Sequence, residues 1–176
     1  SFLDIETTGA SPESGEVTVV GLHHGGNTTS LVRGETLTTE RLQRELDHCD
    51  LLVTFFGSVF DVPYLRAKFP DLRFPTLHFD LCFAARRLAL RGGLKHIEQE
   101  LGIERNRTIS GLDGLDAVRL WFLWRGGDMI ARDTLLTYNR ADTENLVLLA
   151  DRFYEDMMSQ FGPSSLSTTL QPACSQ

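Results

Sequence analysis

A short apolar segment in the first third of the chain constrains the fold more than any other feature. Residues 50–56 read DLLVTFF, and a helical pattern lies on each side of them. A continuous apolar run of this length, without polar alternation, is typical of a strand that is buried on both faces. Such strands lie inside sheets that are covered by helices, so the sequence predicts an α/β protein.

The preceding segment predicts another part of the same sheet. Strand-like stretches open the chain and recur at 16–22 and 28–33, with the turn-rich links GASPESG and HHGGN between them. Short links between sequential strands give an antiparallel meander. A further short strand is expected at 76–79, so the sheet should combine a meander with parallel strands and carry helices on both faces.

Helical patterns occupy most of the remaining chain. The first helix is expected to start from a cap on Thr38 or Thr39 and to bury Leu42 and Leu46. The last helical region is expected to contain a break. The predicted helical ranges are 39–49, 61–70, 81–91, a stretch within 92–103 that Gly102 ends, 115–124 and 128–158.

The length of the chain fits one domain with a sizeable core. We expect this domain to span residues 1–161 of the 176. Residues 162–176, GPSSLSTTLQPACSQ, have the composition of a poorly ordered C-terminal tail. The chain starts with Ser1 rather than Met, so an upstream region or a fused domain is expected.

Charge and cysteine usage narrow the function classes. The formal net charge of −7 argues against a protein that coats nucleic acid through a general basic surface. An enzyme that handles one strand end stays compatible, because bound cations can supply positive charge. Three widely spaced cysteines fit neither a disulfide framework nor a zinc site, which favours the cytoplasm. No apolar run has membrane-spanning length and no signal peptide opens the chain, so no membrane partner is expected.

The octet FLDIETTG at the start of the chain carries two carboxylates one residue apart. In an extended segment, Asp4 and Glu6 share one face, while Leu3 and Ile5 face the other way. Two acids so close repel each other and resist burial. A divalent cation removes this difficulty, which makes both acids candidate metal ligands. The alternative is a strand end that reaches solvent.

Two further acids lie where chemistry could use them. Asp61 follows the buried strand at the start of a helix, where an N-cap is the simpler interpretation. Strand ends in α/β sheets are also places where ligand sites form. Asp142 lies in an apolar helical stripe, four residues after Tyr138. A buried carboxylate there needs a partner, either a cation or an arginine such as Arg140.

Other residues allow two interpretations each. Asp80 precedes the helix at 81–91, and we prefer an N-cap role to that of a fifth acid near a metal. Phe55, Phe56 and Phe60 could include a stacking surface for terminal bases, although most of them are expected in the core.

The four acids occur in the order of the motifs of the DEDD exonucleases, and Tyr138 adds the tyrosine of their Y-x-x-x-D variant. The chain therefore resembles the DEDDy branch of the ribonuclease H-like 3′–5′ exonucleases. Its middle is most similar to the YprB-type subgroup of predicted exonucleases. The stretches that carry this resemblance lie within residues 2–155 and read FLDIETTG, VTFFGSVFDVPYL, HFDLCFAARRL, LKHIEQELGI and YNRADTENLVLL.

The resemblance implies a ribonuclease H-like fold: a mixed five-stranded sheet of order 3-2-1-4-5 in which strand 2 is antiparallel. It also implies two divalent cations, Mg²⁺ or Mn²⁺. Asp4 would bridge both ions, Glu6 and Asp142 would complete the shell of one, and Asp61 would support the other through water. Tyr138 would orient the attacking water rather than act as a strong base, because free tyrosine has a pKa of about 10. Candidate substrate contacts are Thr7, Phe60, Lys95 and Asn139.

The activity implied is hydrolysis of phosphodiester bonds at the 3′ end of single-stranded DNA or RNA. One alternative is a catalytically silent nucleic-acid-binding or adaptor domain on the same fold, against which the presence of all four acids counts. The other is an endonuclease with the same metal site. Phe55-Phe56-Gly57 stands where relatives commonly have Tyr-Asn-Gly, so the amide of that position is absent here.

Overall fold

The computed structural model describes residues 1–162 and contains a five-stranded mixed sheet of order β3-β2-β1-β4-β5. Strand β2 pairs antiparallel with β1 and β3, whereas β1 with β4 and β4 with β5 are parallel pairs. Only β2 therefore runs against the other four strands, and the predicted order and directions are confirmed. The strands are β1 Phe2–Thr7, β2 Val17–His24, β3 Asn27–Val32, β4 Leu51–Thr54 and β5 Leu77–Asp80.

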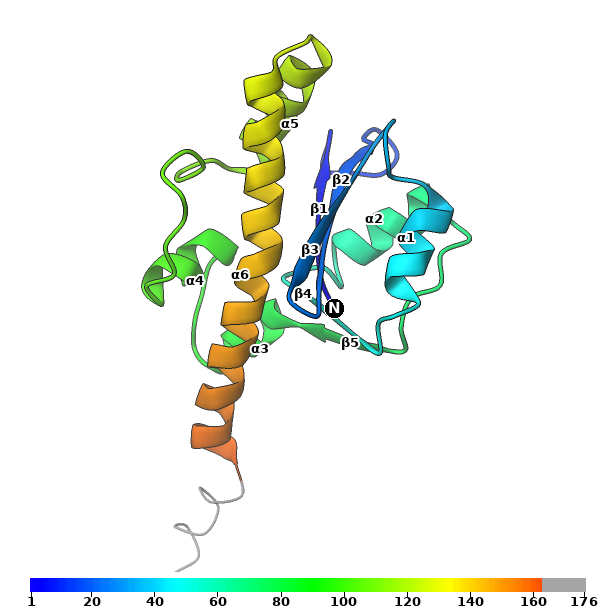
Figure 1. Cartoon of the computed structure of the whole chain (residues 1–176). Coiled ribbons are helices and arrows are strands. Elements are labelled where there is room, and N and C mark those ends of the chain that lie inside the picture. The colour runs from blue at the N-terminus through cyan, green and yellow to red at the C-terminus, as the bar shows by residue number, and fades with distance from the viewer. Residues whose placement is uncertain (163–176) are drawn as a thin grey trace, which may run out of the picture.

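Helices cover both faces of this sheet, as the sequence predicts (Figure 1). Helices α1 Thr39–Leu46 and α2 Asp61–Lys68 pack on one face, where Leu42 and Leu46 join a core with Leu3. The other face is covered mainly by the long C-terminal helix. The remaining helices are α3 Leu81–Arg87, α4 Leu94–Glu100, α5 Gly114–Arg125 and α6 Met129–Phe161.

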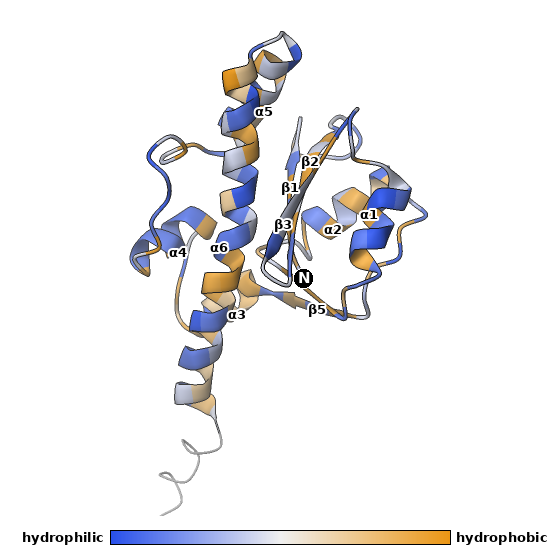
Figure 2. Cartoon of the chain, viewed as in Figure 1, coloured by the Kyte–Doolittle hydropathy of each residue, from blue (hydrophilic) through white to orange (hydrophobic). Residues whose placement is uncertain are grey.

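The alternation of β1 separates the two faces. Leu3 and Ile5 are buried in the core formed with α1 and α2, which leaves Asp4 and Glu6 on the side of α6. Helix α6 alternates apolar and hydrophilic residues along its length (Figure 2). Its predicted stripe is buried, with Leu135, Leu149 and Phe153 fully inside the protein. The sheet and this stripe thus enclose the acids of β1.

Helix α6 is continuous over 33 residues, so the predicted break is wrong. Its sequence contains neither proline nor glycine, the usual causes of a sharp kink. Its start is fixed by Asp128, whose Oδ1 accepts the backbone N–H groups of Ile130 and Ala131. The continuous helix therefore carries Tyr138 and Asp142 along the sheet.

Other boundaries differ from the predictions by a few residues. Strand β2 extends to His24 and β3 starts at Asn27, so the HHGGN link is reduced to a tight hairpin turn. In this turn Gly25 and Gly26 take positive φ, at 56° and 82°. Helix α1 ends at Leu46, and α3 ends at Arg87 because Ala89 takes a left-handed φ of 64°. The predicted tail, 162–176, lies outside the described residues apart from Gly162.

Candidate metal centre

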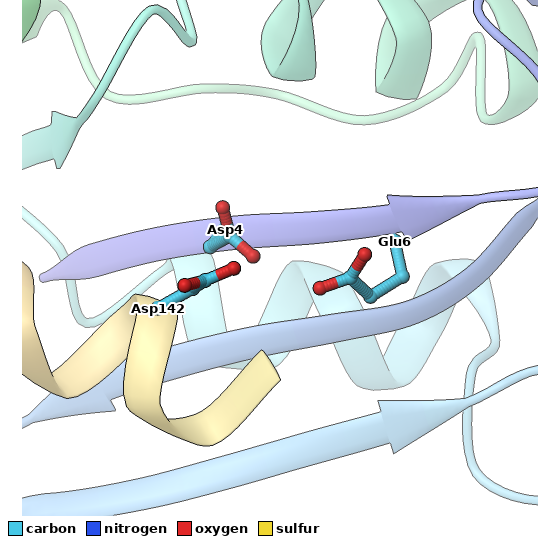
Figure 3. A group of neighbouring side chains, drawn as sticks. All are labelled: Asp4, Glu6 and Asp142. Atoms are coloured by element: carbon cyan, nitrogen blue, oxygen red, sulfur yellow. The ribbon is translucent and has the colours of Figure 1, made fainter. Parts of the chain in front are cut away.

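Three carboxylates from two elements meet beside β1. Oxygen atoms of Asp4, Glu6 and Asp142 all lie within 4.8 Å of one another. Figure 3 shows Asp4 and Glu6 on the strand and Asp142 on the neighbouring helix, with the three carboxylates turned toward a common point. Asp142 and Glu6 are buried and Asp4 is partly buried. The structure therefore brings together three of the four acids that the sequence singled out.

Gly21 allows α6 to lie this close to the sheet. In the β1–β2 register Gly21 is directly opposite Asp4. A Cβ atom at this position would lie 2.6 Å from Asn139 Oδ1 and would overlap the Thr143 hydroxyl group. The absence of a side chain on β2 thus lets the helix carry Asp142 against β1.

Asp61, the fourth of these acids, lies in the same cavity, and the structure excludes the alternative that it is an N-cap. It is the first residue of α2, whose N-cap is Phe60, and Phe60 makes no capping bond through its side chain. Asp61 Oδ1 instead accepts the backbone N–H of Ile5 at 3.1 Å, which ties α2 to β1. The cavity of about 230 Å³ is lined by Asp4, Ile5, Glu6, Phe55, Phe56, Phe60, Asp61, Lys95, Gly114, Tyr138 and Asp142.

Burial is the main influence on the acids of this cavity. It raises the pKa values of Asp4 and Glu6 well above their ordinary range, and the charge of Asp142 raises them further. Burial raises the pKa of Asp61 to about 7. It also raises the pKa of Asp142, although the positive charges of Lys95 and Arg105 oppose this shift. Acids in such a cluster are stabilised by bound protons or by a bound cation.

The donor set fits a divalent cation. Glu6 Oε1 is buried and has no hydrogen-bond partner within residues 1–162. An unpaired buried oxygen is costly, and a cation would satisfy it. Three carboxylates form the hard oxygen set that Mg²⁺ and Mn²⁺ prefer. These residues therefore fit the cations that the sequence resemblance implies.

Lys95 brings a positive charge to the cavity and lies beside Tyr138. Lys95 Nζ donates to the Tyr138 hydroxyl at 2.5 Å, and it lies 3.5 Å from Asp142 Oδ2. The Tyr138 side chain is buried on the sheet-facing side of α6. Burial, and then the negative charge of Asp142, raise its pKa. The hydroxyl therefore keeps its proton at neutral pH and can donate it in a hydrogen bond.

Asn139 and Thr7, two candidate substrate contacts, are occupied within the protein. Asn139 is fully buried, and its Nδ2 donates to Asp4 Oδ2 at 3.0 Å, so it lies behind the acid. Thr7 Oγ1 donates to the backbone carbonyl of Gly9 at 2.8 Å, in the link that follows β1. Of the four candidates, Phe60 and Lys95 line the cavity of the acids.

Phe55 and Phe56 also line this cavity, while Phe55 and Phe60 pack in addition against the hydrophobic cores, as expected for most of these aromatic residues. Phe56 is 41% exposed and takes a left-handed φ of 64°. Asp80 holds this strained residue in place, since its carboxylate accepts the N–H groups of Phe56 and Ser58. Asp80 also caps α3 by accepting the Cys82 N–H, so its predicted N-cap role is confirmed.

The partner of Asp142 differs from the one that the sequence suggested. Arg140, the expected candidate, pairs with Glu144 instead. Arg105 lies in the loop after α4, and its Nη2 is 2.5 Å from Asp142 Oδ1. It also pairs with Glu98, which is almost fully buried. The sequence carries one sign of this ion pair, at Glu98. An acid at an inward-facing position of a helix needs a cation as its partner.

No helix in residues 1–162 combines the length and the apolar character that crossing a membrane requires.

Solved structures share this fold. A nuclease in its apo form aligns over 95% of this chain and 77% of its own, with a TM-score of 0.65 and 20% identity. Brucella melitensis NrnC bound to pGG aligns over 95% of this chain and 77% of its own, with a TM-score of 0.63 and 19% identity. The family B DNA polymerase from the archaeon Pyrobaculum calidifontis aligns over 93% of this chain and 25% of its own, with a TM-score of 0.72 and 16% identity. At these identities the likeness concerns the fold.

The comparison of sequences identifies the family. No curated protein matches the chain. The family described as the RNase H superfamily matches residues 1–154, a range that includes all five strands and the part of α6 that carries Asp142. The chain therefore belongs to the RNase H superfamily.

Proposed function

We propose that the chain is a metal-dependent 3′–5′ exonuclease that hydrolyses phosphodiester bonds at the 3′ end of a single-stranded nucleic acid. The observation that carries this proposal is the meeting of Asp4, Glu6 and Asp142 within 4.8 Å. Asp61 and Tyr138 line the same cavity. Four acids and one tyrosine around a common point suit a site for two cations, Mg²⁺ or Mn²⁺.

Two sequence features support the DEDDy branch and its YprB-type subgroup. Tyr138 and Asp142 have the Y-x-x-x-D spacing, and the helix places both in the cavity. The stretch LKHIEQELGI, part of the resemblance to the subgroup, contains Lys95, which contacts the Tyr138 hydroxyl.

The proposed mechanism assigns a task to each side chain. Bound cations would supply Lewis-acid stabilisation of the charge that develops during displacement at phosphorus. Asp4, Glu6 and Asp142 would hold these cations, and Asp61 would support the second. Tyr138, which stays protonated, donates a hydrogen bond that orients the attacking water. Lys95 offers a positive charge to the scissile phosphate from the edge of the cavity.

The surroundings of the cavity support a strand end as substrate. Phe55, Phe56 and Phe60 border the acids, and aromatic rings stack on bases of any sequence. The presence of pGG in the Brucella NrnC structure is consistent with short single strands as ligands of this fold. The choice between DNA and RNA is left to the experiment.

We extend the proposal to the domain, the cellular location and the partners of the enzyme. We propose residues 1–161 as one catalytic domain in the cytoplasm, where the buried cysteines Cys49 and Cys82 stay reduced. The net charge of −7 gives little general attraction to nucleic acid, so a protein partner or a fused domain would help to capture the substrate.

The test uses single-stranded DNA and RNA of one sequence, labelled at the 5′ end, with Mg²⁺, Mn²⁺ or EDTA. The proposal predicts a ladder that shortens from the 3′ end, that EDTA abolishes, and that is at least about a hundredfold slower for Asp4→Asn. Asp151→Asn is the matched control, because it removes an exposed carboxylate from α6 and should leave the rate unchanged.

A circular single strand of the same sequence separates the alternatives. An exonuclease leaves the circle intact, whereas cutting of the circle would favour the endonuclease. Intact linear strands in every lane, with binding still detectable, would favour a silent nucleic-acid-binding domain.

A further inference from the structure

Arg105 joins two buried carboxylates that come from different helices. Its Nε lies 2.5 Å from Glu98 Oε2 and its Nη2 lies 2.7 Å from Glu98 Oε1, which makes the pair bidentate. The same Nη2 lies 2.5 Å from Asp142 Oδ1. The side chain of Arg105 is 7% exposed and that of Glu98 is 1% exposed. Charges buried this deeply are tolerated only in a fixed, well-paired geometry.

Glu98 is in turn connected to α6. Asn145 Nδ2 donates to Glu98 Oε1 at 3.1 Å. Asn145 lies three residues after Asp142, so both side chains project from the same face of the helix. A series of polar contacts therefore starts and ends on α6, running from Asn145 through Glu98 and Arg105 to Asp142. These contacts restrict the rotation of the Asp142 side chain relative to its own helix.

We propose that Arg105 is a positioning residue that holds Asp142 Oδ1 and thereby presents Oδ2 to a divalent cation. The inference rests on the proposed function, because it assigns Asp142 to the metal. A guanidinium group suits this task, since its planar fork binds Glu98 through two nitrogens and thereby fixes the position of Nη2, which forms the ion pair with Asp142. The other contact of Asp142, to Lys95, is longer at 3.5 Å and involves Oδ2. Groups that orient metal ligands in this way tune metal affinity without touching the ion.

A role in charge neutralisation alone would have the opposite consequence. A cation beside a ligand repels the metal, so removing a charge that only neutralises Asp142 should strengthen metal binding. Removing a group that orients Asp142 should weaken it. The sign of the change in metal affinity therefore separates the two roles.

The experiment measures Mn²⁺ binding by calorimetry at one pH without substrate. Arg105→Gln is expected to weaken Mn²⁺ binding about tenfold. Arg105→Lys, which keeps the charge but lacks the fork, is expected to recover only part of the affinity. Arg107→Gln removes the same charge from an exposed position of the same loop and should bind Mn²⁺ as the unchanged chain does.

A second variant guards against misfolding, since Arg105→Gln leaves the buried Glu98 without its partner. The combined variant Arg105→Gln with Glu98→Gln removes both charges, and it should melt cooperatively and bind Mn²⁺ about tenfold more weakly. In an Asp142→Asn chain, Arg105→Gln should cause no further loss, because the arginine acts through Asp142. The proposal is overturned if the folded double variant binds Mn²⁺ as tightly as the unchanged chain or more tightly. A further tenfold loss in the Asp142→Asn chain would overturn it as well.

Strand cleavage measured on the same samples separates this inference from the proposed function. Arg105-dependent Mn²⁺ binding by a chain that cleaves no strand would contradict the nuclease function and support the positioning role.

Discussion

Asp61 and Asp80 occupy matching places in the fold, and the structure gives them different surroundings. Each stands at the start of a helix that follows a parallel strand: Asp61 is the first residue of α2, which follows β4, and Asp80 is the last residue of β5 and the N-cap of α3. The carboxylate of Asp80 accepts hydrogen bonds from several protein donors: the N–H groups of Phe56, Ser58 and Cys82, and the Ser58 hydroxyl. Asp61 accepts the N–H of Ile5 and faces a cavity that contains three other acids.

The comparison shows that position before a helix does not define the task of an aspartate. A carboxylate saturated by protein donors stabilises the local backbone, which here includes the left-handed Phe56. A carboxylate with few donors beside other acids is available to a cation, at a cost to the stability of the metal-free protein.

Of the changes that test this difference between Asp61 and Asp80, Asp61→Asn should have the largest effect. The amide keeps the size of the side chain and an oxygen for the Ile5 N–H, but it removes the charge that would support the second cation. We expect cleavage to slow about a hundredfold, with little loss of thermal stability. Rates on labelled strands and a thermal melt check this. A rate within threefold of the unchanged chain would place Asp61 with Asp80 as a structural residue.

Asp80→Ala should affect stability, in contrast to Asp61→Asn, which should affect the cleavage rate. It leaves the N–H groups of Phe56, Ser58 and Cys82 without their acceptor, so the free energy of unfolding should fall by about 2 kcal/mol. Urea unfolding measures this change. Thr38→Ala is a matched control, because Thr38 caps α1 through the Arg41 N–H alone and should cost about 1 kcal/mol. Equal losses in the two variants would mean that the Phe56 loop does not depend on Asp80.

Asp61 also predicts how stability depends on pH. Its pKa is raised to about 7 in the folded chain, against about 4 in an unfolded one. Between these values the folded state binds more protons than the unfolded state, so the stability of the metal-free chain should fall as pH rises from 4 to 7. Melting temperatures in EDTA test this, with Asp61→Asn expected to flatten the fall. A profile that is the same for both chains would contradict the shift.

Relief of strain at Phe56 should give the smallest effect. Asparagine tolerates a left-handed φ better than phenylalanine, so Phe56→Asn should raise the free energy of unfolding by about 1 kcal/mol. Ala89, which has the same φ of 64° outside the cavity, provides the control: Ala89→Asn should gain a similar amount. Only Phe56→Asn should weaken binding of a labelled strand, because Phe56 borders the acids. Equal binding by both variants would argue against base stacking on Phe56.

Much of the sheet could be predicted because its signals are local. The alternation of Leu3, Asp4, Ile5 and Glu6 defines the two faces of β1, and the structure confirms both faces. Predictions stayed open or were wrong where local patterns are ambiguous. An aspartate near the start of a helix fits a cap whether or not it makes one, so for Asp61 the sequence alone left the cap open as an alternative to the metal site. The break expected in α6 had no proline or glycine to cause it.

The contacts that complete the candidate site join residues far apart in the sequence. Asn139 reaches Asp4 across 135 positions, and Arg105 reaches Asp142 from a loop without regular pattern. Neither contact leaves a periodic signal, because each depends on how α6 lies against the sheet beside Gly21. Motif order could therefore identify the acids, whereas their supporting partners required the three-dimensional arrangement.

The most direct test of the metal centre is the anomalous scattering from a crystal of the chain grown with Mn²⁺. We expect a manganese peak in contact with carboxylate oxygens of Asp4, Glu6 and Asp142, and its loss in a crystal of the Asp4→Asn variant. Well-ordered carboxylates with no manganese between them, at a concentration that saturates other Mn²⁺ sites on the protein, would contradict the assignment of this cluster as a metal centre.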